Sequence, residues 1–162
     1  MSMPELSLRP ATEGDMELLY EIFKSTREAE FAYTPWTGAE KEAFLRQQFR
    51  AQDMHYRTYY AGTSFDILLV DGVPAGRLYV LRGDDIRIID IALLPAFRNG
   101  GIGTRVLRGL ADEADRQHKR LSIHVEVQNP ARRLYDRFDF RVVEDKQVYL
   151  LMERSPSGAA VS

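Results

Sequence analysis

The chain has 162 residues, 44% of them apolar and 28% charged, a composition typical of a folded globular domain. Its formal net charge is −2, so no overall positive field would recruit nucleic acid or an anionic membrane. The absence of cysteine excludes disulfides, thiolate metal sites and a cysteine nucleophile. The sequence shows no signal peptide and no apolar run of about 18 residues, and we therefore expect a cytoplasmic protein.

The N-terminal part of the sequence predicts a strand followed by two helices. Residues 5–11 (ELSLRPA) alternate between polar and apolar side chains, as strands do. Thr12 or Asp15 can cap the next segment, whose apolar residues recur at helical spacing. A second helical pattern runs from Gly38 to about Gln52.

The middle of the chain changes to a strand pattern. Residues 64–70 (SFDILLV) and 74–81 (PAGRLYVL) flank the dipeptide Asp71-Gly72, a strong signal for a two-residue hairpin turn. Residues 86–94 (IRIIDIALL) then predict a third strand, rich in isoleucine.

The C-terminal part alternates between helices and strands. Asn129 is positioned to cap a short helix, and Pro130 suits its first turn. The elements expected here are a helix over about 102–117, a strand over 121–127, a helix over 129–138 and two strands within 140–154. The order β-α-α-β-β-β-α-β-α-β-β predicts one domain over residues 1–154, with a parallel crossover in an otherwise antiparallel sheet. Residues 155–162 are small and polar, and we expect a flexible tail.

The segment 93–103 (LLPAFRNGGIG) places three glycines within four positions where a strand gives way to a helix. A helix start presents unpaired N–H groups and the positive end of the helix dipole. Glycines there would let a phosphate group approach the backbone, and Arg98 adds a cation with a planar donor face. The alternative is a tight turn that needs glycine only for its positive φ angle. The glycines alone leave both interpretations open.

Two common phosphate-binding motifs do not fit this segment. A P-loop requires lysine before Ser or Thr, whereas Gly103 precedes Thr104. The dinucleotide fingerprint G-x-G-x-x-G would need a glycine where Val106 stands, and the chain has no room for two βαβαβ halves.

Residues 98–103 (RNGGIG) do fit R/Q-x-x-G-x-G/A, the acyl-coenzyme A pyrophosphate motif of the GNAT N-acetyltransferase superfamily. Upstream, IDIALLP resembles that family's fourth strand; downstream, IHVEVQNPARRLYDRFDF resembles its fifth strand and the helix carrying A-x-x-L-Y-x-x-x-G-F. The resemblance covers residues 86–143, and the element order agrees from about residue 5 to 154. It implies a mixed α/β fold: one GNAT-like domain with a mostly antiparallel sheet, a splayed parallel pair of fourth and fifth strands, and helices on both faces.

The sequence departs from the family pattern at Asp139, which stands where the family usually has glycine before phenylalanine. Aspartate tolerates left-handed backbone conformations better than most residues. We therefore expect the turn to be kept, at some energetic cost.

The resemblance implies a binding site for acetyl-CoA along this part of the chain. The backbone of Ala92 and Leu93 would pair with the pantetheine arm, and an N–H near Leu93 would face the thioester oxygen. Asn129 would add a hydrogen bond to the cofactor beside its role as a cap. The amides implied to hold the pyrophosphate are those of Arg98, Asn99, Gly100, Gly101, Ile102, Gly103 and Thr104.

The resemblance also implies catalytic roles for two residues. Tyr135 stands where the family keeps its general acid, and a phenol with a pKa of about 10 can protonate a departing thiolate. Without the resemblance, the residue pattern favours Tyr135 as a core residue on an apolar helix stripe with Leu134 and Phe138. His124 matches a fifth-strand position where some members carry a catalytic carboxylate, and an imidazole can accept a proton from an ammonium. Glu126, two residues on, points to the same side and is a further candidate for the base and for binding the acceptor. Alternatively, His124 and Glu126 form a solvated pair.

Asp90 lies inside an apolar strand, where an unpaired carboxylate is costly. It is either an alternative base or the partner of Arg77 or Arg87. The loop between the first two helices carries Phe31, Tyr33 and Trp36, which either line the acceptor pocket or cover the core. No metal site is readable, and the other two histidines, His55 and His118, are expected on the surface.

We therefore expect an acyltransferase, an acetyl-CoA-dependent N-acetyltransferase that lets a primary amine attack directly in a ternary complex; the lack of cysteine argues against an acetyl-cysteine intermediate. The acceptor would be a small molecule or a peptide, and the resemblance allows a homodimer. The alternative is a non-catalytic coenzyme A-binding sensor or regulatory module, since binding of the pyrophosphate needs only the backbone of residues 98–104 and the side chain of Arg98. A nucleotide-phosphate binder of another fold is a third possibility.

Overall fold

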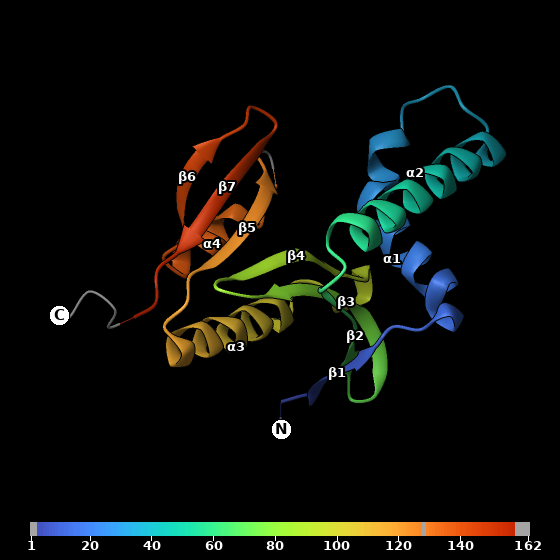
Figure 1. Ribbon diagram of the computed structural model, residues 1–162. Helices are drawn as coiled ribbons and strands as arrows, with labels where there is room; N and C mark the ends of the chain where they lie inside the picture. Colours follow the sequence, from blue (N-terminus) through green and yellow to red (C-terminus); the bar gives the residue numbers. More distant parts are fainter. Residues whose placement is uncertain (1–2, 128, 158–162) are drawn as a thin grey trace. The chain divides into compact units, whose positions relative to one another are not determined.

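A computed structural model describes residues 3–127 and 129–157 (Figure 1). Its strands are β1 (Leu6–Pro10), β2 (Ser64–Val70), β3 (Val73–Arg82), β4 (Ile86–Leu93), β5 (Leu121–Glu126), β6 (Arg141–Asp145) and β7 (Tyr149–Arg154). Its helices are α1 (Met16–Arg27), α2 (Gly38–Tyr59), α3 (Ile102–Gln117) and α4 (Arg132–Arg137), with short 3-10 helices η1 (Glu13–Asp15), η2 (Glu28–Phe31) and η3 (Pro95–Phe97). The predicted order of strands and α-helices is confirmed. None of the described helices is long and apolar enough to cross a membrane.

The strands form one mixed sheet in the order β1-β2-β3-β4-β5-β7-β6. β4 and β5 pair in parallel, with Ile88 opposite Ile123, whereas β5 and β7 run antiparallel. The crossover from β4 through α3 to β5 produces this parallel pair, because a connection through a helix returns the chain in the same direction. The predicted fold class is confirmed.

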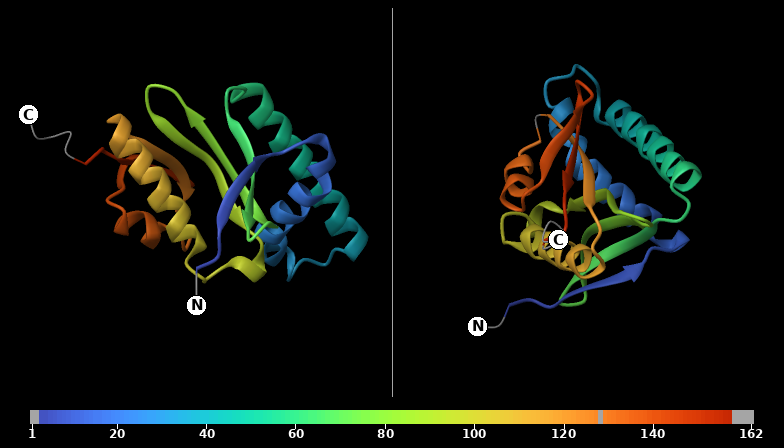
Figure 2. Two further views of the ribbon diagram at one scale, coloured as in Figure 1. Left: turned by 90° about the horizontal axis from the view of Figure 1, so that it is seen from below. Right: turned by 60° about the vertical axis from the view of Figure 1, so that its left-hand side comes forward.

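The first of two compact units contains the described part of residues 1–79 together with residues 90–97. Here α1 and α2 lie side by side (Figures 1 and 2). Tyr20 of α1 meets Phe49 of α2 edge to face, with ring centroids 5.7 Å apart. α2 begins at a capping box of Thr37 and Glu40 but extends to Tyr59, well beyond the predicted end at Gln52. The last turns of α2 are rich in residues of modest helix propensity, so the sequence alone does not predict them as helical. They are stabilised by contacts of Tyr56 with Asp90 and Tyr79 of the sheet.

The second unit contains residues 80–89 and 98–157. α3 packs against β5 and has the predicted buried stripe, formed by Ile102, Val106, Leu107, Leu110, Ala111 and Ala114. Its last turn is fastened by Arg154 at the end of β7, whose guanidinium makes two hydrogen bonds of 2.9 and 3.1 Å to Asp115. Ser157, at the start of the expected tail, donates its N–H to the same carboxylate. Residues 158–162 of that tail lie outside the described residues.

Candidate functional site

The predicted phosphate-binding segment, residues 98–104, forms the entry to α3 in the second unit. Asn99 and Gly101 both have positive φ angles, 63° and 85°, which turn the chain sharply into the helix. Gly101 is the N-cap and no side chain caps this end. The first intrahelical hydrogen bond runs from the N–H of Arg105 to the carbonyl of Gly101, 3.0 Å. The N–H groups of residues 102–104 precede that bond and can therefore donate to an external anion.

The three glycines of this segment have different roles. Gly101 needs its positive φ, which supports the turn interpretation at that position. A Cβ atom at Gly100 or Gly101 would meet nothing within 4 Å, so the backbone there faces open space. A Cβ at Gly103 would lie 3.8 Å from the side chain of Leu134 on α4. The loop is thus both a conformational turn and an accessible backbone, and it lies against the helix that carries Tyr135.

Ala92 and Leu93 lie at the end of β4, in the first unit. Gly76 of β3 approaches them so closely that a Cβ there would overlap the carbonyl oxygen of Ala92 and lie 3.0 Å from the Cα of Leu93. The N–H of Leu94 donates to the carbonyl of Ala75, 2.8 Å. Gly76 therefore sets the position of this backbone. Gly76 was not among the predicted site residues, although a glycine inside a strand pattern is a signal for a close approach of another backbone.

Tyr135 lies on α4 in the second unit and is 4% exposed. Its ring packs near Phe140, with centroids 5.6 Å apart, so it also contributes to the core. Asn129 was expected to cap this helix, but the helix begins at Arg132 with Ala131 as its N-cap. The side-chain oxygen of Asn129 instead accepts the N–H of Ala131, 2.8 Å, and closes the turn before the helix. The predicted cap was thus two residues early.

His124 and Glu126 lie on the same side of β5 and are partly exposed, whereas Ile123 and Val125 are buried. The Nζ atom of Lys146, on the β6–β7 turn, lies 3.4 Å from Nε2 of His124. Burial lowers the pKa of His124, and the positive charges of Arg87 and Lys146 lower it further. The imidazole is therefore neutral at pH 7 and can accept a proton. Lys146 was not among the predicted site residues, because only the antiparallel pairing of strands β5, β7 and β6 brings it close to His124.

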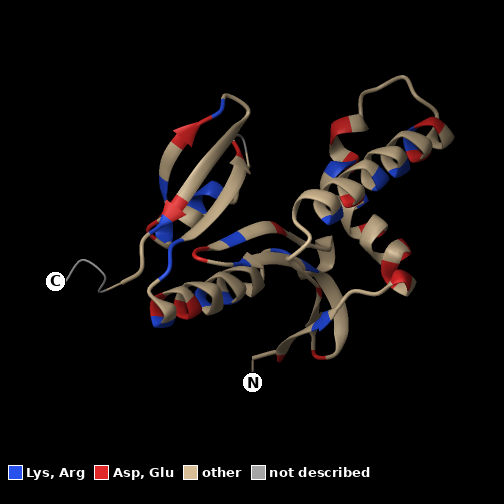
Figure 3. Ribbon diagram, viewed as in Figure 1, with Lys and Arg blue, Asp and Glu red and all other residues tan. Residues whose placement is uncertain are grey.

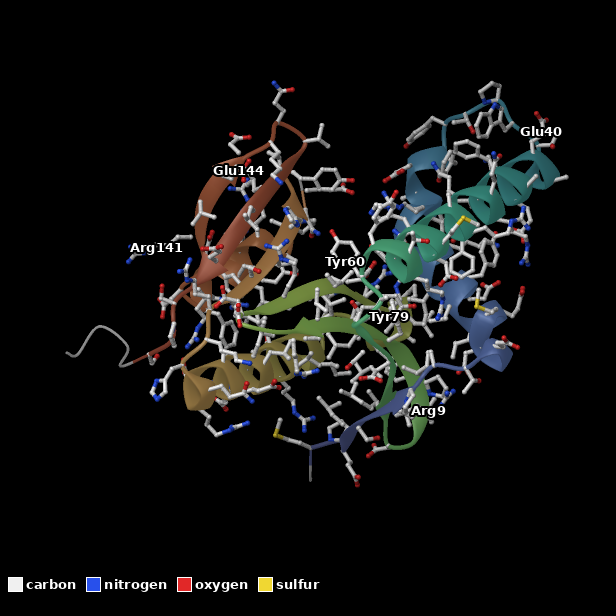
Figure 4. All side chains as sticks on the ribbon, in the orientation of Figure 1. Arg9, Glu40, Tyr60, Tyr79, Arg141 and Glu144 are labelled. Carbon is white, nitrogen blue, oxygen red and sulfur yellow. The ribbon has the colours of Figure 1, made fainter. Side chains whose placement is uncertain are left out.

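The carboxylate of Asp90 forms an ion pair with the guanidinium of Arg77, 2.8 Å away. Pairing with an arginine was one of the two predicted alternatives for Asp90. Arg87, the other candidate, donates to the hydroxyl of Ser122. Arg77 also lies 5.1 Å from the ring centre of Tyr79, which Figure 4 labels. The hydroxyl of Tyr56 donates to the same Asp90 oxygen, 2.9 Å. Asp90 is thus part of a shielded polar cluster in the first unit, and its structural role is the better supported one.

The aromatic residues of the loop between α1 and α2 divide into two groups. Phe31 and Trp36 stack, with centroids 5.7 Å apart, and both meet Phe44 of α2 edge to face. Tyr33 is fully exposed. Phe31 and Trp36 thus cover this end of α2, while Tyr33 is free to meet another molecule. The two histidines expected on the surface, His55 and His118, are exposed.

The predicted site residues fall into both units. The second unit holds residues 98–104, His124, Glu126, Asn129 and Tyr135, and Lys and Arg residues (blue in Figure 3) occur on both of its helices. The first unit holds Ala92, Leu93 and the aromatic loop. Among residues 3–127 and 129–157, no group of three or more His, Asp or Glu side chains is placed to hold a metal ion.

Comparisons with known proteins agree with this architecture. The sequence pattern of the acetyltransferase (GNAT) family matches residues 17–140. A Bacillus subtilis (strain 168) protein named "Putative ribosomal protein bS18-alanine N-acetyltransferase" is 29% identical over 127 residues, which cover 76% of this chain and 73% of that protein. An acetyltransferase from Thermus thermophilus has a similar fold, with a TM-score of 0.68, 22% identity, and coverage of 96% of this chain and 99% of that one. The PaiA N-acetyltransferase of Thermoplasma acidophilum, in complex with coenzyme A, has a TM-score of 0.67 and 14% identity, with coverage of 93% and 99%.

The family match spans most of the chain and includes the α3 entry, β5 and α4 described above. The mixed sheet with its parallel β4–β5 pair is the fold of the solved acetyltransferases. This protein belongs to the acetyltransferase (GNAT) family.

Proposed function

We propose that this chain transfers the acetyl group of acetyl-CoA to a primary amine by direct attack within a ternary complex. The observation that carries this proposal is the uncapped start of α3, where residues 102–104 offer N–H groups and Gly100 and Gly101 leave the backbone open. Such an end suits the pyrophosphate of coenzyme A, because the helix dipole and several donors act together on one anion. Arg98 adds positive charge at the same loop.

In this proposal the amine nitrogen attacks the thioester carbonyl carbon, the C–S bond breaks, and the departing thiolate takes a proton from the hydroxyl of Tyr135. His124 takes the proton that the ammonium must lose before attack, directly or through water. The nitrogen loses a second proton as the amide forms, and that proton restores the hydroxyl of Tyr135 through water. Its lowered pKa supports this role, since the imidazole is available as a base at neutral pH. The backbone at Ala92 and Leu93 would hold the pantetheine arm and polarise the carbonyl.

The acceptor is proposed to be the amine of a peptide or a small molecule. The name of the Bacillus subtilis relative describes transfer to an alanine of a ribosomal protein. A peptide with N-terminal alanine is therefore the first acceptor to test, beside a panel of small amines. Glu126 and the exposed Tyr33 are the side chains we propose for contact with the acceptor.

The test measures coenzyme A binding by calorimetry and free-thiol release from acetyl-CoA with each amine. We expect Tyr135→Phe to bind coenzyme A but to lower thiol release at saturating substrates by about 100-fold or more. Tyr59→Phe, at an exposed position on α2, is the matched control and should behave as the wild type. Binding without thiol release for any amine would favour the non-catalytic sensor. Absence of binding to the folded protein would overturn both.

A further inference from the structure

A pocket of about 300 Å³ lies in the second unit, beside the phosphate-binding loop. It is lined by Thr104, Arg108, Arg137, Phe138, Asp139 and Arg154. Thr104 belongs to both places, because it is the last residue of the loop and one wall of the pocket. Any ligand whose pyrophosphate lies on the N–H groups of residues 102–104 therefore has the pocket directly next to that group.

The lining of the pocket is rich in positive charge. Among residues 3–127 and 129–157, neither Arg108 nor Arg137 forms an ion pair with a carboxylate, and both are exposed at the pocket. Arg154 is 7% exposed and is bound to Asp115, but its Nε atom is buried without a hydrogen-bond partner. The one carboxylate in the lining belongs to Asp139. The hydrogen bonds to Asp115 raise the pKa of the Arg154 guanidinium, and the charge of Asp139 raises it further. Arg108 and Arg137 are thus the two arginines of the lining whose guanidinium groups can bind an anionic ligand.

Arg108 is also held in place before any ligand arrives. Its guanidinium lies over the ring of Phe138, 5.5 Å from the centroid. Stacking of this kind restricts the side chain, so less conformational entropy is lost when its donors are used. A planar guanidinium suits a phosphate better than an ammonium does, because it can make two parallel hydrogen bonds.

We propose that this pocket binds the phosphate on the ribose 3′-oxygen of coenzyme A, through Arg108 and Arg137. The inference rests on the proposed function, since it takes the pyrophosphate to lie on the α3 loop. The 3′-phosphate is a second anionic group, one ribose away from the pyrophosphate. A pocket that adjoins the loop and holds two arginines with no carboxylate partner among the described residues matches that chemistry. The protein should therefore distinguish coenzyme A from 3′-dephospho-coenzyme A.

The experiment compares the dissociation constants of these two compounds by calorimetry, for the wild type and for Arg137→Ala, Arg108→Gln and the control Arg116→Ala. Arg116 is exposed on α3, outside the pocket, and its removal changes the net charge equally. We expect the wild type to bind coenzyme A about tenfold or more tightly than the dephospho compound. Each pocket variant should reduce that ratio toward one, mainly by weakening coenzyme A binding, while Arg116→Ala keeps it. Thermal unfolding of each variant checks that it is folded.

The outcomes separate this inference from the proposed function. Equal affinity of the wild type for both compounds would overturn the pocket assignment and leave the pyrophosphate site intact. A ratio that persists in both Arg137→Ala and Arg108→Gln would overturn it as well. Binding of neither compound would overturn the proposed function itself.

Discussion

The guanidinium of Arg77 on β3 lies 2.8 Å from the carboxylate of Asp90 on β4, and the two side chains are only 4% and 15% exposed. Arg77 also donates to Gln52 of α2, 2.8 Å, and Tyr56 of α2 donates to Asp90. Burial, and then the Asp90 charge, raise the pKa of Tyr56, so its hydroxyl stays protonated as a donor. The pair and its hydrogen bonds thereby fasten the last turns of α2 to two strands.

Replacement of Asp90 by asparagine should destabilise the protein strongly. It would leave the guanidinium of Arg77 shielded from water without a counter-charge, a change that typically costs about 3–5 kcal/mol. Urea unfolding followed by circular dichroism measures the loss. The double variant Arg77→Met, Asp90→Leu removes both charges and should lose less. If Asp90→Asn alone were as stable as the wild type, the Arg77–Asp90 pair would contribute little to the free energy of unfolding.

Gly76→Ala should disturb the end of β4. The added methyl group would overlap the carbonyl oxygen of Ala92, so one of the two strands has to shift, at a cost of about 1–3 kcal/mol. If Ala92 and Leu93 hold the pantetheine arm, the KM for acetyl-CoA should rise more than kcat falls. Steady-state thiol release and urea unfolding measure the two effects. The control is Gly83→Ala, where a methyl group would meet nothing within 4 Å. Equal behaviour of the two variants would contradict this account.

Local signals in the sequence were sufficient for much of the fold. Asp71 and Gly72 were predicted as a hairpin turn, and both have positive φ angles, 50° and 81°, as a type I′ turn requires. The α3 stripe and the glycine turn before it follow equally from spacing along the chain. In these cases the residues that decide the structure are neighbours in the sequence.

The sequence could not predict the features that depend on contacts between distant segments. Asp90 had two possible arginine partners, and the one that pairs with it in the structure is Arg77, on the neighbouring strand β3. The contact between Lys146 and His124 joins the β6–β7 turn to β5, 22 positions earlier in the chain, and the pocket arginines come from α3, α4 and β7. No pattern in one segment contains this information.

Asp139 provides a test of a purely conformational effect. Its φ angle is 67°, the left-handed conformation expected where the family usually has glycine. Asp139→Gly should therefore be more stable than Asp139→Ala, by about 1 kcal/mol, because glycine adopts this conformation without strain. At Asp136, inside α4, the order should reverse, since alanine is the better helix former. Urea unfolding of the four variants measures both differences, and the same order at both sites would contradict the explanation.

The pH dependence of activity should report on His124 and its neighbour Lys146. Removing the ammonium group in Lys146→Gln takes away one of the positive charges that lower the pKa of His124, so that pKa should rise toward its ordinary value. A base with a higher pKa becomes protonated at a higher pH, and the acid limb of kcat/KM should therefore move to higher pH. Glu144, the acidic group that acts on His124 in the opposite sense, remains in this variant.

Proton NMR of the His124 ring gives the pKa directly, and thiol release as a function of pH gives the acid limb. Lys119→Gln, a lysine that does not act on His124, is the control and should change neither. If His124 is the base, the two measurements should move together in Lys146→Gln. A ring pKa that rises while the acid limb stays fixed would mean that another group, or water alone, accepts the proton, and the catalytic role proposed for His124 would then be wrong.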